Sequence, residues 1–370
     1  MVEFFDDAGF DDARNEVEID DHALRRPLGL KRALERDVEA VRMPVQARAL
    51  PSVVWEHVRG LELELLANQH DKQSSVRART PPSMLHTNRA ALVVMHVQGE
   101  ISSPTIPGGL YDVSADGRPL ILPSVGGISL NVRVGDGAFA FVGDHIEPAV
   151  SARHPDDRVN VGFCVLACVG NKATVLSGDA KGEVGYVTGK HGGIEHVMID
   201  FNERVMAKMA LGDKIGVRSC GLGLELTDAG DIKVFNSDPE FLEKMGAEMR
   251  EGSLHVPVAK VVPASIMGSG LGRSSVVRGD YDIQSFDDEM VEKYGLNELR
   301  FGDIVAIENA DHSFGRIYRG GAMSVGIVAH GASHTAGHGP GVTSLLTSRS
   351  GKIVPHVDAK ANIATILDLR

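Results

Sequence analysis

VLSGDAKGEVGYVTGK (residues 175–190) carries the pattern from which the expected architecture of this chain follows. Short apolar runs are bounded by glycine and polar residues, which is typical of strands that end in tight turns. Glycine supplies the positive φ angle of such a turn, and the aspartate of Gly178-Asp179 can hydrogen-bond the backbone two residues on. This stretch therefore predicts β-structure.

The same pattern recurs on both sides of this stretch. Further strands are expected at residues 91–101, 128–143, 158–170, 196–201 and 214–220. The Gly-Asp pair returns at Gly135-Asp136, Gly143-Asp144, Gly212-Asp213, Gly279-Asp280 and Gly302-Asp303. Repeated turn-then-strand units of this kind indicate small curved barrels. We therefore expect a mainly β (α+β) fold with two small barrel-like or sandwich domains and few helices.

Helical patterns are confined to a few places. Asp238–Gly252 and Phe286–Leu296 are expected as helices, the first with an Asp cap and Pro in its first turn. Residues 28–41 and 51–67 show helical spacing, and 70–83 form a polar linker that ends in Pro-Pro. The expected domains are a helical extension with its linker (1–82), a β-rich domain (83–235) and an α+β domain (236–370). The extension is expected to pack on the main body or on a neighbouring subunit, and the protein to be a homo-oligomer.

The composition narrows the choice of partners and of compartment. The chain has 370 residues and a formal net charge of −12, which argues against binding DNA or an anionic membrane surface. Three cysteines imply no disulfide framework, and the N-terminus shows no signal pattern. No apolar run is long enough to span a membrane. We expect a soluble cytoplasmic protein that acts on a small molecule.

Two glycine-bordered segments contain candidate metal ligands. In residues 143–148, GDHIEP, His145 and Glu147 would share one face of a strand end, and Asp144 would point the other way unless a bulge re-aims it. An imidazole and a carboxylate on one face form half of a metal site. In residues 189–196, GKHGGIEH, glycines around His191 let it approach a ligand closely. A solvated strand end and a satisfied core histidine, His196, are the plain alternatives.

The densest cluster of histidines follows an apolar run. AMSVGIVAHGASHTAGHGPGV (residues 322–342) begins as a buried strand that ends near His330, and His334 and His338 follow at intervals of four. The glycines and Pro340 exclude a stable helix, so the histidines are expected on a loop that leaves a strand. A merely flexible, solvated loop is the alternative. No Gly-Lys-Ser/Thr follows, so this is not a phosphate loop.

Several long motifs together resemble one protein family. They include FVGDHIEPAVS (141–151), SGDAKGEVGYVTGKHGGIEHVMIDF (177–201), LRFGDIVAIENADHSFGRIYRGGAMSVGIVAHG (299–331) and AGHGPGVTSLLTSRSGKI (336–353). In this order they resemble the domain-of-unknown-function 4438 family of prokaryotic proteins, over about residues 84–356. The resemblance implies a β-rich fold in two parts and no particular activity.

The histidine clusters predict a metal-dependent hydrolase of a small polar amide or cyclic amide. The expected metal ligands are His145, Glu147, His191, His338 and His330. A divalent ion can lower the pKa of bound water and polarise a carbonyl; Zn is the default for such donors, with Mn or Fe as alternatives. Asp144 or Glu195 would act as general base or orient a ligand histidine. Lys190 or Arg316, together with Arg278, would hold the charged end of the substrate.

Two other functions fit the same residues. The segment 180–193 resembles the glycine–valine–glycine turn of SH3-like barrels in translation factors, which favours a non-catalytic, ligand-binding or RNA-associated barrel; the net charge disfavours RNA. A metal-free lyase or isomerase could use His191 and Glu195 as acid and base. The hypotheses of an enzyme require the three histidine-containing segments to lie close together in the folded protein.

Overall fold

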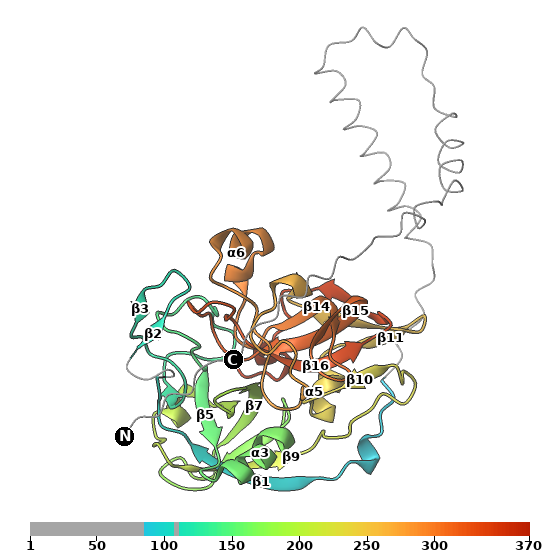
Figure 1. The fold of residues 1–370 in the computed structure, drawn as a ribbon. Helices are drawn as coiled ribbons and strands as arrows, with labels where there is room; N and C mark the ends of the chain where they lie inside the picture. The colour runs from blue at the N-terminus through green and yellow to red at the C-terminus, as the bar shows by residue number, and fades with distance from the viewer. Residues whose placement is uncertain (1–84, 107–110) are drawn as a thin grey trace, which may run out of the picture. The chain divides into compact units, whose positions relative to one another are not determined.

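The structure of the chain is a computed structural model, and it describes residues 85–106 and 111–370. Strands dominate these residues, and the helices between them are short (Figure 1). The predicted mainly β fold class is confirmed. The extension predicted at residues 1–82, with its two helices and its linker, lies outside the described residues.

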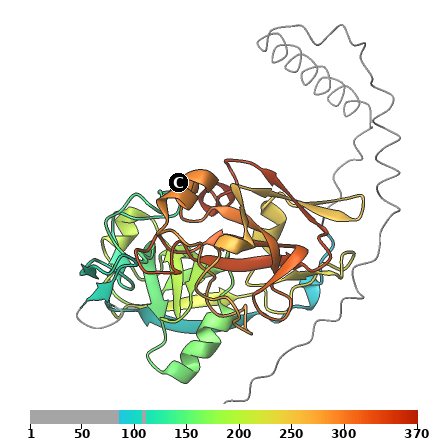
Figure 2. The ribbon, with the colours of Figure 1, turned by 45° about the horizontal axis from the view of Figure 1, so that its top comes forward.

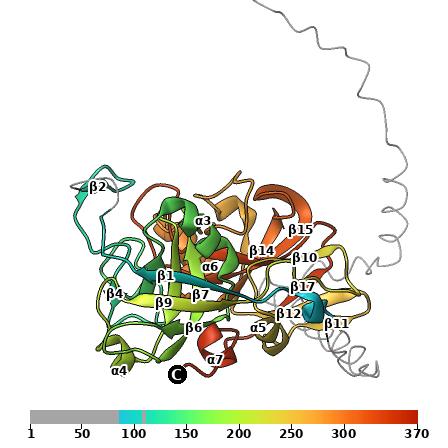
Figure 3. The ribbon, with the colours of Figure 1, turned by 90° about the horizontal axis from the view of Figure 1, so that it is seen from below.

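Six of the described strands close into an antiparallel barrel. Their order around it is β1, β9, β6, β7, β8 and β5, and β1 closes the ring by pairing with both β9 and β5. Figure 3 shows β1 and β9 side by side. Aliphatic side chains such as Val187, Val197 and Val217 fill the core. The bounds are Met95–Ile101 (β1), Ala149–Arg153 (β5), Lys172–Val175 (β6), Val184–His191 (β7), His196–Asp200 (β8) and Lys214–Ser219 (β9), with Ile128–Ser129 (β4) added beside β5.

A second sheet has its own hydrophobic core. Its five strands follow the order β10, β16, β15, β14 and β13, and only the β13–β14 pair is parallel. In Figure 2 the orange and red strands of this sheet lie to one side of the green barrel strands. The bounds are Ile232–Val234 (β10), Lys260–Pro263 (β13), Ile304–Asp311 (β14), Ile317–Val328 (β15) and Val342–Ser348 (β16). Smaller sheets combine Glu248–Arg250 (β11), Ser253–Val258 (β12) and Ile353–Val357 (β17), and Asp112–Val113 (β2) with Pro119–Leu120 (β3).

One predicted strand, residues 158–170, is wrong, because most of it forms helix α3 (Asp157–Leu166). Asp156 caps this helix and accepts hydrogen bonds from the backbone N–H groups of Arg158 and Val159. The buried residues Asn160, Phe163 and Cys164 are three and four apart, which places them on one helical face. The helix cap and the spacing of the buried residues favour a helix more strongly than the valine-rich composition of the run favours a strand.

The prediction of a long strand at 128–143 is also wrong. The two-residue strand β4 pairs with β5, turns follow it, and Gly137 forms an isolated bridge with Arg300. Asp136 accepts a hydrogen bond from the backbone N–H of Arg133 at 2.8 Å, and Gly135 has a φ angle of 95°. The guanidinium of Arg133 is buried against Asp200, 2.5 Å away. The chain must turn here to form this buried ion pair. The alternating apolar residues of the segment therefore do not form a strand.

Capping residues set where the helices in the second half of the chain begin. Helix α5 (Pro239–Lys244) begins at the predicted Asp238 cap but ends eight residues before Gly252, because Gly246 has a φ angle of 77° and β11 begins at Glu248. Helix α6 (Asp288–Tyr294) lies within the predicted range and ends at Gly295. The other helices are α4 (Glu203–Met206) and α7 (Ile363–Ile366), with 3₁₀ turns at Arg89–Ala91, Ala264–Ile266 and Leu296–Glu298. None of the described helices has the length and hydrophobicity that a bilayer-spanning helix needs.

The barrel and the second sheet meet at the end of β7. The backbone N–H of Lys190 donates to Oγ1 of Thr343 in β16 at 2.9 Å, and that hydroxyl donates to the carbonyl of Lys190 at 3.1 Å. A Cβ on Gly189 would lie only 2.7 Å from the Cβ of Ala329, so the absence of a side chain permits this approach. The end of β7 therefore lies beside the end of β15, and the histidines that follow these strands come together.

Candidate metal centre

His145 lies in a loop and is held by the carboxylate of the preceding residue. Its left-handed φ angle of 55° brings its Nδ1 to 2.6 Å from Oδ2 of Asp144. Oδ1 of Asp144 accepts hydrogen bonds from Ser333 Oγ and from the backbone N–H of His334, both at 2.9 Å. The expected strand end, in which Asp144 would point away from His145, is wrong because the segment turns here. Since Nδ1 is occupied, Nε2 is the ring atom that His145 can offer to a ligand.

Glu147 is buried and lies behind two histidines. One of its oxygens lies 2.7 Å from Nδ1 of His191, and the other lies 2.9 Å from Nδ1 of His196. Its second oxygen also accepts from the backbone N–H of Gly126 at 2.7 Å and from Ser151 Oγ at 2.5 Å. Burial opposes the charge, but the two imidazoles hold the pKa of Glu147 well below its usual value. Glu147, predicted as a metal ligand, is thus placed to orient His191.

The first group of ligand atoms, here called the inner trio, consists of His191, Asp280 and His330. All three residues are buried, and the two imidazoles stack with centroids 4.0 Å apart. His330 directs Nδ1 toward the carbonyl of Gly331 at 3.0 Å, so its Nε2 faces Oδ2 of Asp280 at 2.6 Å. Oδ1 of Asp280 accepts from the backbone N–H of Gly192 at 2.9 Å. Three atoms that could bind a metal ion therefore converge at the junction of the two sheets.

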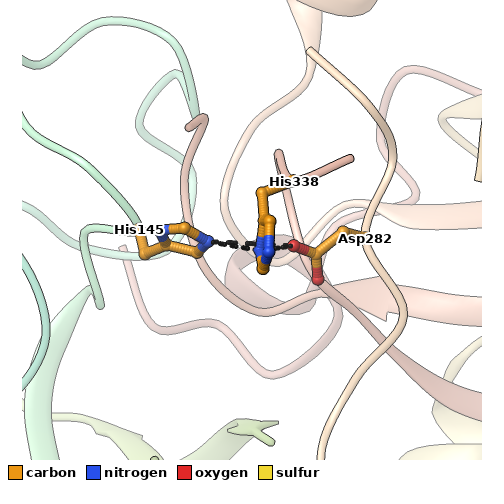
Figure 4. A group of neighbouring side chains, drawn as sticks. All are labelled: His145, Asp282 and His338. Atoms are coloured by element: carbon orange, nitrogen blue, oxygen red, sulfur yellow. Dashed lines mark hydrogen bonds and ion pairs between the residues drawn. The ribbon is translucent and has the colours of Figure 1, made fainter. Parts of the chain in front are cut away.

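The second group, the outer trio, consists of His145, Asp282 and His338 (Figure 4). Nε2 of His145 lies 3.0 Å from Nδ1 of His338 and 3.8 Å from Oδ2 of Asp282. Nδ1 of His338 lies 3.2 Å from the same carboxylate oxygen. The side chain of His338 is 35% exposed, whereas His145 and Asp282 are buried. These separations suit three ligands that face one point.

The two trios are neighbours. The ring centroids of His145 and His330 are 5.2 Å apart, and Oδ1 of Asp282 lies 3.7 Å from Nε2 of His330. Asp282 therefore presents one oxygen to each trio. Oδ2 of Asp280 and Nε2 of His330 approach each other without hydrogen-bond geometry. A Cβ on Gly341 would lie 2.1 and 2.2 Å from these two atoms, so glycine keeps this space free of side chain.

The trios concentrate opposite charges in a buried place. Burial lowers the pKa of an imidazolium, but Asp280 and Asp282 outweigh it and raise the pKa of His330 well above its usual value. Burial likewise opposes the carboxylate charges, and the facing histidines still lower the pKa values of Asp280 and Asp282. The pKa of His145 is lowered, chiefly by burial. Both carboxylates are thus ionised at neutral pH and can act as anionic ligands.

A cavity of about 370 Å³ adjoins the trios. Asp280 and His338 contribute to its wall, so both trios border it. Glu195, predicted as a base, and Arg278, predicted to bind substrate, both line the cavity and form an ion pair at 3.0 Å. Arg316, the other predicted substrate-binding residue, lines it as well. The structure therefore brings most of the predicted side chains to one place.

Lys190 does not line this cavity. Its side chain is buried, and Nζ donates to Oδ1 of Asn236 at 2.7 Å and to the carbonyl of Val277 at 3.0 Å. Side chains alternate along β7, so Lys190 points away from the face that carries His191. Burial lowers the pKa of Lys190. The predicted catalytic or substrate-binding role of this lysine is not supported by its position, which is that of a cation bridging interior carbonyls.

The sequence patterns do not single out two residues of the trios, Asp280 and Asp282. They stand in RGDYDIQ (residues 278–284), where Gly279-Asp280 looks like one more turn among several. The available signal is the Asp-x-Asp spacing, which places two carboxylates on the same side of an extended chain. A satisfied core histidine is one of the alternatives that the sequence leaves open for His196, and its contact with Glu147 agrees with that interpretation.

Comparisons with known proteins identify relatives of the chain. The N-terminal domain model of DUF4438, a domain of unknown function, matches residues 111–243, and the C-terminal model of the same family matches residues 244–367. The crystal structure of a protein called TM1086 is similar, with 43% sequence identity and a TM-score of 0.73. The similarity covers 78% of this chain and 99% of that one. No curated protein sequence matches the chain.

Proposed function

Because the chain belongs to the DUF4438 family, whose description names no reaction, we propose its function from the site itself: a hydrolase that uses two divalent metal ions to cleave a small polar amide or cyclic amide. The observation that carries this proposal is the pair of adjacent His-Asp-His trios. Two-metal hydrolytic sites hold their ions about 3.5–4 Å apart, and trios that share the Asp282 carboxylate suit such a spacing.

The hydrogen bonds behind the histidines support ligand roles. A metal-binding histidine typically donates its other ring N–H to a carboxylate or a backbone carbonyl, which fixes its tautomer. Asp144 is the acceptor for His145, Glu147 for His191, and the carbonyl of Gly331 for His330. Three rings are therefore held with Nε2 toward the trios before any ligand arrives.

The ions would supply hydrolytic chemistry to a substrate in the adjoining cavity. A divalent ion polarises a carbonyl and lowers the pKa of bound water. The side chains of the cavity would position the amide, and Glu195 would accept and return a proton because its carboxylate lines the cavity. Asp144 is occupied by His145, Ser333 and His334, so we assign it the orienting role. Four imidazoles and two carboxylates favour Zn, with Mn or Fe as alternatives.

Metal analysis of the purified full-length chain tests this proposal directly. We expect two divalent ions per chain by mass spectrometry and a fall to background in the His145→Ala/His191→Ala double variant. His334→Ala is the matched control, because His334 lies on the same loop, is exposed, and belongs to neither trio. Unchanged metal content in the double variant would refute the metal centre.

Turnover is the second part of the test. Hydrolysis should be screened against linear amides and cyclic amides, before and after exhaustive chelation. We expect cleavage that disappears with chelation and returns when the native ion is added back. Cleavage that survives complete removal of metal would favour the metal-free acid–base alternative instead.

A further inference from the structure

Arg316 is a buried cation that forms no ion pair with a carboxylate of the described residues. Its residue exposure is 1%, and Nη2 of its side chain donates a hydrogen bond to the carbonyl of Gly279 at 3.3 Å. Nε has no hydrogen-bond partner among the described residues. Guanidinium groups that are removed from water are normally paired with a carboxylate or phosphate, because an unpaired buried charge is costly. The site thus provides a positive charge whose partner is missing.

The surroundings of Arg316 fix its orientation without neutralising it. Its Cζ lies over the Tyr281 ring, 5.9 Å from the centroid, at the outer range of a cation–π attraction. Burial lowers the pKa of Arg316, and Asp280 only partly offsets this effect. An anion that entered the cavity would complete the hydrogen bonds of a group that is already positioned.

The charge of the cavity wall indicates which anion would fit. Arg273, Arg278 and Arg316 line the cavity together with the carboxylates of Glu195 and Asp280. Arg278 is paired with Glu195, which leaves Arg273 and Arg316 against the one carboxylate of Asp280, so the arginines and carboxylates of the wall are net positive. A negatively charged group therefore suits this wall; a carboxylate brings one charge, whereas a phosphate monoester carries close to two. A volume of about 370 Å³ is also enough for a small organic molecule.

We infer that this cavity recognises an organic carboxylate, held by Arg316 with help from Arg273, so that the substrate is an amide that also carries a carboxylate group. The second half of this statement rests on the proposed function; the binding of a carboxylate does not. His338 lines the same cavity as Arg316, so a bound molecule can reach the outer trio with its amide while its carboxylate lies against the guanidinium. Arg316 then selects the substrate, and the trios act on it.

Ligand-observed NMR titration of the full-length protein tests the inference. The probes are hippurate, which carries an amide and a carboxylate, its neutral carboxamide, and phenyl phosphate. They are titrated into protein as purified and into protein treated with chelator, and metal content is measured alongside. We expect hippurate to bind roughly 10- to 100-fold more tightly than the carboxamide, with or without metal, because a charge-assisted hydrogen bond of this kind is lost in the neutral probe.

Variants separate recognition from structural support. Arg316→Gln should abolish the preference for hippurate over its carboxamide, whereas a purely structural role would weaken both probes alike. Arg273→Gln, at an exposed position, should reduce the preference several-fold without affecting folding. Arg250→Gln is the control, since Arg250 is exposed on β11 and pairs with Glu248. Circular dichroism confirms that each variant is folded.

The possible outcomes are distinct. Equal binding of hippurate and its carboxamide, or a preference that survives in both Arg316→Gln and Arg273→Gln, overturns the inference. Tighter binding of phenyl phosphate than of hippurate replaces the carboxylate by a phosphate. Protein that contains no metal as purified but keeps the preference refutes the proposed hydrolase and leaves the carboxylate site intact. A metal-loaded protein without the preference refutes the carboxylate site and leaves the proposed metal centre intact.

Discussion

The inner and outer trios each consist of two histidines and one aspartate but are built on different parts of the fold. His191 is the last residue of strand β7, His330 lies two residues after β15, and every member of the inner trio is buried. His145 and His338 of the outer trio lie in loops, and His338 is half-exposed. Ligands on strand ends are positioned by the hydrogen bonds of a sheet, whereas loop ligands depend on local contacts. The inner trio therefore suits a tightly held ion, and the outer trio an exchangeable position that meets substrate.

Asp282 is the residue that joins the two trios, and its removal should have the largest effect. Asp282→Ala should remove both ions and reduce kcat/KM by roughly 1,000-fold or more, because metal ions supply several kcal/mol of transition-state stabilisation. Metal analysis and amide hydrolysis measure this effect. Asp358→Ala, at an exposed position, is the control. Retention of one full equivalent of metal in Asp282→Ala would show that the trios are independent.

Removing one histidine from each trio tests their difference in burial. In metal-free protein, His330→Ala should destabilise the fold by about 3 kcal/mol, because Asp280 is left buried without its cation. His338→Ala should cost less than about 1 kcal/mol, because its side chain is partly solvated. Urea unfolding in the presence of chelator gives both values. Equal losses would contradict the distinction between the trios.

The orienting carboxylates should affect one ion each. Asp144→Asn should weaken the ion of the outer trio, and Glu147→Gln the ion of the inner trio, each by about 10- to 100-fold, since such partners set the tautomer and basicity of a ligand histidine. Competition with a chromogenic chelator measures the two affinities separately. Glu195→Gln serves as the reference: it should leave both affinities unchanged while lowering turnover. Loss of both ions in either orienting variant would mean that the trios are coupled through more than Asp282.

The last expected effect concerns acid stability behind the trios. His312 is buried beside Tyr281 and Ser344, and burial, aided by Arg316, lowers its pKa to about 3. The unfolded chain binds a proton near pH 6.5 while the folded chain does not. The stabilising contribution is therefore complete above pH 6.5 and is lost as pH falls from 6.5 toward 3, by up to about 1.4 kcal/mol per pH unit.

His312→Gln removes this dependence. Between pH 6.5 and 4.5, chelator-treated wild-type protein should lose about 1 kcal/mol of stability per pH unit more than the variant does. Urea unfolding at several pH values checks the slope, and His334→Ala should keep the wild-type slope because His334 is exposed. A variant as acid-sensitive as the wild type would assign the effect to another group.

The trios also show where prediction from sequence succeeds and where it stops. His145, His191, His330 and His338 were selected because glycine-bordered loops at strand ends commonly carry ligands, and the structure brings all four together. Asp280 and Asp282 were missed because a Gly-Asp pair is also an ordinary turn. Glu147 was assigned as a ligand, but it lies one contact further back, behind His191. That distinction depends on a backbone turn at His145 which alternation in a strand would not produce.

The barrel strands β1, β7, β8 and β9 were foreseeable for a similar reason, whereas β5, β6 and α3 were not. The four predicted strands follow alternating apolar runs and turns that act over a few residues. Residues 158–170 are equally rich in β-branched side chains, but the capping interaction of Asp156 and the burial of one face made them helical. When a segment has helix and strand preferences of similar size, it adopts the one whose apolar face can be buried in the core.

By itself, the amino-acid sequence determined that the chain is β-rich, which strands carry histidines at their ends, and that glycine surrounds these histidines, because these are properties of neighbouring residues. Only the tertiary structure decided that His145 and His338, 193 positions apart, lie 3.0 Å from each other, and that one aspartate faces both trios. Such proximity follows from packing two sheets with separate cores against each other. Ligand geometry of this kind is a consequence of how the sheets are packed, and no local pattern encodes it.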